Sequence, residues 1–202
     1  MGRASRADAA KHREEIVAAT ARLLRERGVG GVSVQDVMSA AGLTHGGFYK
    51  HFGSKDELMG IATDSAFDEL ISLLRQLHQD HPDGAEARSA LISSYLSSQH
   101  RDSPGTGCAN AGIAADAARA ESGSPLRASY TTGLRTTIEL LAELQDPQVT
   151  DDGTARERAI MCLTTMVGAM TLARATSDDP VSNEILQVVQ DALLRRGGTH
   201  HR

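Results

Sequence analysis

The segment that most constrains the fold is residues 33–58, SVQDVMSAAGLTHGGFYKHFGSKDEL. It contains two capping-box patterns, S-x-x-D at 33–36 and S-x-x-E at 54–57. Each pattern marks a helix start, where side chains bond backbone amides that the helix itself leaves unpaired. Gly42 lies between the two patterns, and glycine commonly ends a helix. Two helix starts and a helix end this close together require short helices separated by tight turns.

Hydrophobic spacing places these helices along the chain. Apolar residues recur at helical spacing over 9–28, and we predict a first helix there, ended by a glycine. We then expect short helices over 33–41 and 44–51, and a long helix from 54 to about residue 79. Two short helices joined by a glycine-containing turn form a helix-turn-helix.

The remainder of the chain also has helical patterns, so the predicted fold class is all-α. Further helices are expected near 85–101, 108–120, 126–145, 154–176 and 181–196. We predict an N-terminal three-helix helix-turn-helix domain followed by a larger helical bundle. The expected division is a flexible basic N-terminal arm at 1–12, the helix-turn-helix domain at 13–55, the larger bundle at 56–196, and a flexible tail at 197–202.

Charge is distributed unevenly along the chain. Residues 1–55 hold nine Lys and Arg against five Asp and Glu, which gives +4. The whole chain carries −5, so the remainder carries −9. This asymmetry suggests that the first part meets a polyanion, although scattered charge is also ordinary on helical surfaces.

Residues 13–62 resemble the DNA-binding domain of the tetracycline-repressor (TetR) family of bacterial transcription regulators. The resemblance rests on the apolar spacing from Ile16 to Gly28 and on three patterns: S-V-x-D-V at 33–37, A-G-L-T at 41–44 and F-Y-x-H-F-x-S-K-x-E-L at 48–58. It implies a homodimeric, ligand-responsive regulator, most often a repressor, that binds a palindromic operator in double-stranded DNA. It also implies that 13–55 is the DNA-binding domain and that 56–196 is the ligand-binding (effector-binding) and dimerisation domain. An unknown small-molecule or electrophilic effector would release it.

The second short helix carries the predicted DNA contacts. The N-terminal end of a recognition helix reaches base edges in the major groove. Phe48 and Phe52 lie four residues apart and share a face, so we assign them to the core. His51 and Lys55 are expected to bind phosphates. The candidate DNA-binding residues are Ser33, Thr44, His45, Gly46, Gly47, Tyr49, Lys50, His51 and Lys55.

The last two helices are the candidate dimer surface. Residues 159–173 are almost uncharged over about four turns, which is too apolar for a helix facing water. An ordinary buried core helix accounts for part of this stripe. The resemblance implies that the last two helices pair with their mates in a four-helix bundle. The candidate interface residues are Ile160, Leu163, Val167, Gly168, Ile185, Val189 and Leu193.

An effector pocket is expected between the bundle helices. Its candidate residues are Tyr95, His100, Cys108, Asn110, Tyr130, Met166 and Met170. Cys108 begins a predicted helix, where a thiol feels partial positive charge and becomes more reactive. Its Gly-Cys pair resembles that of TetR-family regulators that sense electrophiles or oxidants. The alternative is a small buried residue that only packs.

Other chemistry is not indicated. The chain lacks a phosphate loop, a nucleophile elbow and cysteine pairs with zinc spacing, so we expect no enzyme activity, no cofactor and no metal. No window approaches the roughly 18 apolar residues of a membrane helix. We expect a bacterial cytoplasmic protein that is nucleoid-associated when bound to DNA. The alternatives are a helical enzyme and an architectural protein that binds DNA without sequence preference.

Overall fold

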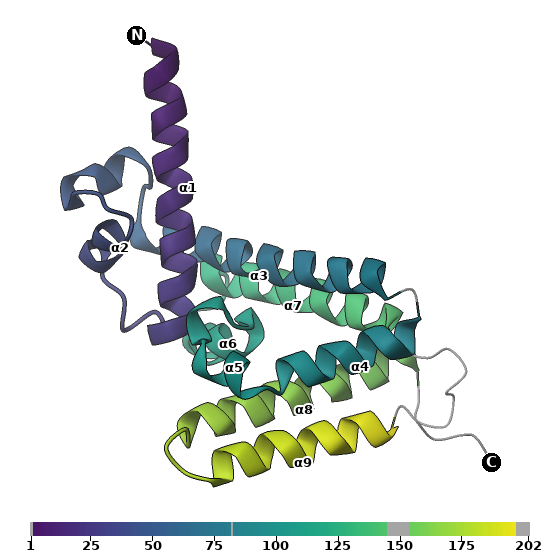
Figure 1. Cartoon of the computed structure of the whole chain (residues 1–202). Coiled ribbons are helices and arrows are strands. Elements are labelled where there is room, and N and C mark those ends of the chain that lie inside the picture. The colour runs from purple at the N-terminus through teal and green to yellow at the C-terminus, as the bar shows by residue number, and fades with distance from the viewer. Residues whose placement is uncertain (1, 82, 145–153, 197–202) are drawn as a thin grey trace. The chain divides into compact units, whose positions relative to one another are not determined.

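The structure is a computed structural model that describes residues 2–81, 83–144 and 154–196 (Figure 1). Within these ranges every regular element is a helix, which confirms the predicted all-α class. The predicted tail, 197–202, lies outside the described residues. In chain order the elements are α1 (Gly2–Arg27), α2 (Val34–Ala40), the 3-10 helix η1 (His45–Lys50), α3 (Lys55–Asp80), α4 (Gly84–Tyr95), α5 (Ser98–Asp102), the 3-10 turn η2 (Pro104–Thr106), α6 (Ala109–Arg119), α7 (Pro125–Glu143), α8 (Ala155–Ala175) and α9 (Val181–Arg196).

The described residues form two compact units. The first is built from the chain up to Glu69 together with Pro104–Gly133, and the second from Leu70–Ser103 together with the chain from Leu134 on. Helices α3 and α7 each contribute to both units. The predicted domain boundaries stay predictions; these units group the residues differently because η2 and α6 pack against α1.

The first unit is organised around α1. Ile16, Leu23 and Leu24 on its apolar stripe are buried, and α1 contacts α2, η2 and α6. Gly28 ends α1 with φ +67° and donates its N–H to Leu24 O at 2.9 Å. Gly42 follows α2 with φ +71°. Both glycines occupy the left-handed region that other residues rarely adopt, so the two helix ends predicted from glycine are confirmed.

Three elements differ from the sequence-based expectations. Helix α1 begins at Gly2, so residues 2–12, predicted as a separate arm, continue the helix. These residues include no large apolar side chain, but Ala, Arg and Lys have high helix propensity. The second short helix is a 3-10 helix rather than an α-helix. The predicted helix 85–101 is divided into α4 and α5, because Ser97 accepts the N–H of His100 and starts a new helix there.

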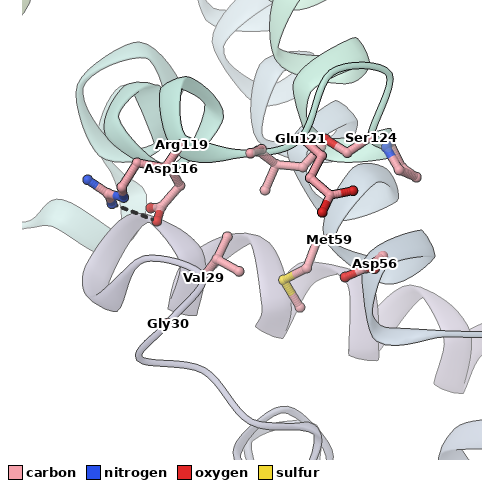
Figure 2. Close-up of a pocket in the computed structure, with 11 residues that line it drawn as sticks. Val29, Gly30, Asp56, Met59, Asp116, Arg119, Glu121 and Ser124 are labelled. Carbon is pink, nitrogen blue, oxygen red and sulfur yellow. Dashed lines mark hydrogen bonds and ion pairs between the residues drawn. The ribbon is translucent and has the colours of Figure 1, made fainter.

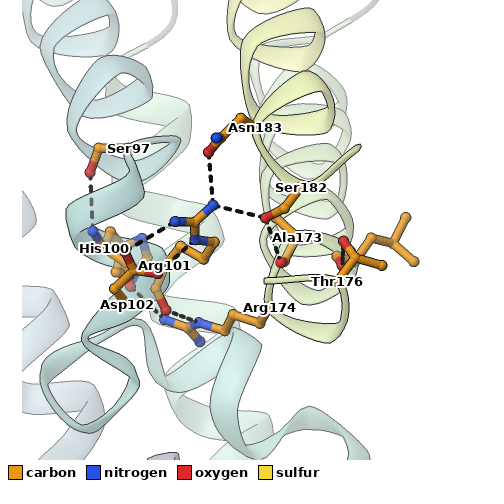
Figure 3. Close-up of polar contacts among 10 residues, drawn as sticks. Ser97, His100, Arg101, Asp102, Ala173, Arg174, Thr176, Ser182 and Asn183 are labelled. Atoms are coloured by element: carbon orange, nitrogen blue, oxygen red, sulfur yellow. Dashed lines mark hydrogen bonds and ion pairs between the residues drawn. The ribbon is translucent and has the colours of Figure 1, made fainter. Parts of the chain in front are cut away.

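The second unit contains α8 and α9, which run side by side (Figure 1). Thr154 and Glu157 form a capping box that starts α8. A polar network ties α5 to both helices (Figure 3). Arg101 donates to Ser182 Oγ at 2.9 Å and to Asn183 Oδ1 at 2.8 Å, while Arg174 donates to the carbonyl of His100 at 2.9 Å.

Candidate nucleic-acid interface

Helix α2 is held at its start by the predicted capping box. Ser33 N donates to Asp36 Oδ2 at 2.8 Å, and Asp36 N donates to Ser33 Oγ at 3.1 Å. The Ser33 hydroxyl and N–H lower the pKa of the Asp36 carboxyl, helped by the positive charges of Arg27 and Lys55. The Ser33 hydroxyl bonds the Asp36 carboxylate within the capping box. The predicted DNA contact of Ser33 stays a prediction.

Two phenylalanines anchor η1. Phe48 is fully buried, Phe52 is 2% exposed, and their ring centroids lie 5.7 Å apart. The Arg13 guanidinium of α1 lies 4.8 Å from the centre of the Phe52 ring, a cation–π contact that sequence reasoning missed. Thr44 precedes η1 but makes no capping bond with its side chain. Packing by the two aromatic rings therefore fixes this short helix more than local capping does.

Most of the other residues of η1 are exposed to solvent. Tyr49 is 72% exposed, and His45, Gly46 and Lys50 are exposed as well. Thr44, just before η1, is also exposed. The exposed set contains a phenol, an imidazole, a hydroxyl and an ammonium group, which together can donate to phosphates and to acceptors on base edges. Most of the predicted DNA-contact residues are thus accessible to solvent.

Three other predicted contacts are less accessible. Gly47 is half-buried, and a Cβ built on it would lie 3.4 Å from the terminal methyl of Met38. His51 is half-buried with its ring 6.5 Å from that of His12, a neighbour that only the fold reveals. Lys55 is half-buried, and its ammonium group donates to Val29 O at 3.3 Å. Lys50 is therefore the freer cation for a phosphate.

The start of α3 lies beside this surface. Glu57 N donates to Ser54 Oγ at 3.0 Å, as the predicted capping box requires. The Glu57 carboxylate accepts the N–H of Gly53, at 2.7 Å, rather than that of the cap residue. Both bonds orient the turn that connects η1 to α3.

The candidate effector residues fall into both units. Cys108, Asn110 and Tyr130 belong to the first unit, and Tyr95, His100, Met166 and Met170 to the second. Asn110 is 2% exposed, and both polar atoms of its side chain lack a partner among the described residues. Burial, and then the neighbouring Cys108, raises the pKa of Tyr130 to about 12, so its phenol is neutral at physiological pH.

In the second unit, Tyr95, Met166 and Met170 are buried. The His100 ring packs edge-on against Tyr95 at 4.6 Å and contacts the Tyr95 carbonyl through Nδ1 at 2.7 Å. Burial lowers the pKa of His100, which favours the neutral imidazole.

The apolar side chains of α8 and α9 lie on two faces. Leu163 and Leu193, both predicted at a dimer interface, are buried within the protomer. Ile160, Val167, Ile185 and Val189 are half-buried, and Gly168 is exposed. Met161, Leu172 and Val188 were not predicted, yet each is 58% exposed.

Neither a metal centre nor a membrane span is evident in the described ranges. Their His, Cys, Asp and Glu side chains form no cluster of three or more suited to a metal ion. No helix there combines the length and apolar character needed to cross a bilayer.

Comparison with known proteins agrees with this arrangement. Residues 16–60 match the family model described as "Bacterial regulatory proteins, tetR family". The chain is 27% identical to Rv0196 of Mycobacterium tuberculosis, an uncharacterized HTH-type transcriptional regulator, over 82% of this chain and 86% of that protein. It is 35% identical to Rv3405c of the same organism, an HTH-type transcriptional repressor, over 35% and 38% of the two chains.

The fold agrees as well. The crystal structure of a TetR-family transcriptional regulator from Agrobacterium tumefaciens superposes with a TM-score of 0.79 and 20% identity, covering 93% of this chain and 98% of that chain. The helix-turn-helix match and the regulator relatives together support a DNA-binding transcriptional regulator. Residues 16–60 match the TetR-family DNA-binding domain, and the relatives and the fold support a TetR-family transcriptional regulator. Regulators of this family bind DNA as dimers, respond to small molecules and are normally not enzymes.

Proposed function

We propose that the chain is a transcriptional repressor that binds a palindromic operator as a homodimer and leaves it when an effector binds. The observation that carries this proposal is the contrast within η1 between buried Phe48 and the exposed residues His45, Tyr49 and Lys50. A rigid anchor beneath an accessible polar surface is what reading a groove requires. Its target would be the bacterial chromosome, in the cytoplasm and at the nucleoid.

The dimer would form through α8 and α9. Met161, Gly168 and Leu172 lie along one exposed stripe of α8, and Val188 adds an exposed apolar side chain from α9. Large apolar side chains that are more than half exposed and lie close together indicate an interaction surface. We infer that a second copy of the chain covers it, since regulators of this family act as dimers. Two-fold symmetry then requires half-sites about one helical turn apart or slightly more.

The effector would be recognised in part by Asn110. Its buried carboxamide offers a donor NH₂ group and an acceptor oxygen that have no partner in the described part of the chain. A ligand that pairs both atoms would be favoured, because buried polar groups left without partners are unfavourable. Release from DNA requires that the ligand bind the conformation that cannot bind DNA more tightly than it binds the DNA-binding conformation.

The first test concerns phosphate binding. Lys50→Ala is expected to weaken binding to all DNA sequences, because it removes an exposed cation from the reading surface. The slope of log K against log salt should fall by about 0.9 if one phosphate contact is lost. Fluorescence anisotropy over a salt series would measure both quantities.

The matched control for this test is Arg75→Ala, which removes an exposed cation on α3 outside the first unit. It should leave the affinity and the salt slope unchanged. An unaltered slope in Lys50→Ala would exclude Lys50 from the phosphate contacts.

The second test concerns Cys108, the N-cap residue of α6, whose side chain makes no capping bond. Cys108 is only 6% exposed, which favours packing over reaction with an electrophile. We therefore expect wild type and Cys108→Ser to bind DNA equally and to respond equally to N-ethylmaleimide in a gel-shift titration. Release of the wild type alone would identify Cys108 as an electrophile sensor instead.

A further inference from the structure

Three nitrogen-bearing side chains meet where α1 passes the end of η1. His12 and Arg13 lie on α1, and His51 is the residue that follows η1. The rings of His12 and His51 are 6.5 Å apart and nearly perpendicular, and the His51 ring lies 6.3 Å from that of Phe52. The Arg13 guanidinium lies 4.8 Å from the centre of the same Phe52 ring. His12, Arg13 and His51 are called the α1–η1 cluster below.

Phe52 holds this cluster at the protein surface. Its ring is 2% exposed, whereas the three side chains of the cluster are half-buried and reach solvent. A guanidinium held over an aromatic face keeps its N–H groups available, because they lie in its own plane. The ring therefore positions Arg13 without occupying its hydrogen-bond donors.

The donors of the cluster are not used within the described part of the chain. There, the Arg13 guanidinium makes no hydrogen bond and no ion pair, and its one marked contact is with the Phe52 ring. The preceding cation on α1, Lys11, differs because it pairs with Glu15 at 3.8 Å. A half-buried cation without a counter-charge favours the approach of an anion, since burial has already removed part of its hydration.

Acidic side chains form no ion pair with the cluster in the described ranges. Glu57, at the start of α3, accepts the N–H of Gly53 at 2.7 Å. Asp56, Asp116 and Glu121 line a cavity of about 430 Å³ between the end of α1, the start of α3 and the α6–α7 connection (Figure 2). No residue of the cluster lines that cavity, so the cluster keeps its positive charge for an external partner.

The position of the cluster indicates which anion it meets. His51 directly follows Lys50, which is exposed beside Tyr49, so the cluster adjoins the residues proposed to contact DNA. We propose that His12 and Arg13, together with His51, bind one phosphate of the DNA backbone beside the helix-turn-helix. Hydrogen bonds of about 2.9 Å from the two imidazoles can converge on one phosphate between rings at this separation. Arg13 supplies the charge, and α1 thereby helps to fix the register of the protein on the duplex.

This contact rests on the proposed function, because it requires that the chain bind DNA. Arg13→Met keeps an apolar side chain over Phe52 and removes the cation. Fluorescence anisotropy of a labelled duplex of mixed sequence would be measured over a salt series. The slope of log K against log salt should fall by about 0.9, and the affinity at about 0.1 M salt should fall about eightfold. Loss of mere support for η1 would lower the affinity without changing the slope, because the slope counts phosphate contacts.

His12→Ala tests the second member from α1. It removes a hydrogen bond to a charged group, so the affinity should fall about tenfold. Combined with Arg13→Met it should cost less than the product of the two single losses, because both side chains bind the same phosphate. Urea denaturation would verify that each variant is folded.

The matched control is Arg22→Met, which removes an exposed cation near the other end of α1 that pairs with Glu26 at 3.4 Å. It should leave the affinity and the slope unchanged. An unchanged slope in folded Arg13→Met, while the wild type binds the duplex, would overturn the phosphate contact and leave the proposed function intact. A wild-type chain that binds no duplex would overturn both.

Discussion

Phe48→Ala is expected to lower the free energy of unfolding by about 3–5 kcal/mol, as large-to-small changes of buried aromatic residues do. Phe48 is fully buried and packs against Phe52 and Tyr49. Because Thr44 makes no capping bond, η1 depends on this packing for its position. The variant should therefore lose DNA affinity together with stability, as urea denaturation and anisotropy would show.

Tyr49→Ala provides the contrast, because Tyr49 is the adjacent residue but is 72% exposed. It should leave the urea midpoint nearly unchanged, as exposed substitutions usually do, and still reduce DNA affinity. If Phe48→Ala were as stable as wild type, the assignment of Phe48 as the anchor of η1 would be wrong. If Tyr49→Ala bound DNA normally, the assignment of Tyr49 as a DNA contact would be wrong.

Gly168→Leu is expected to convert the dimer to a monomer and to weaken operator binding by about a hundredfold or more, because the second reading head would no longer add avidity. A Cβ at Gly168 would meet nothing within 4 Å in the protomer, and the position is exposed, so we expect the leucine to clash with a partner rather than with its own protomer. Removing a helical glycine also relieves a cost of about 1 kcal/mol. The protomer itself should remain folded, and light scattering would measure its mass.

Ala115→Leu is the control, since it adds the same side chain to an exposed position on α6. It should remain dimeric. A Gly168→Leu protein that stays dimeric at low micromolar concentration would place the interface away from this stripe.

Local sequence signals predicted the helix-turn-helix well. The Ser33–Asp36 capping box and the glycines at 28 and 42 act within a few residues, so their chemistry is readable from the sequence. The 3-10 geometry of η1 was not readable, because it depends on how Phe48 and Phe52 pack. The α4–α5 break escaped notice because Leu96 and Ser97 include neither Gly nor Pro.

The surfaces formed by distant segments were harder to predict. Helix α8 is apolar on both sides, so hydrophobic spacing cannot distinguish buried Leu163 from exposed Met161. Asp56 and Glu121 line the same cavity, although they lie far apart in the sequence and Glu121 belongs to no motif. Such juxtapositions follow from the packing of α1, α3 and α6, and only the fold reveals them.

Selection of bound DNA from a random-sequence pool, followed by footprinting of the enriched sites, tests sequence-specific reading by a dimer most directly. The selected DNA should contain an inverted repeat whose half-sites lie about one helical turn apart or slightly more. Tyr49→Ala and Lys50→Ala should protect it weakly at the same protein concentration. A pool that shows no enriched sequence, or a single motif without an inverted partner, would contradict the account.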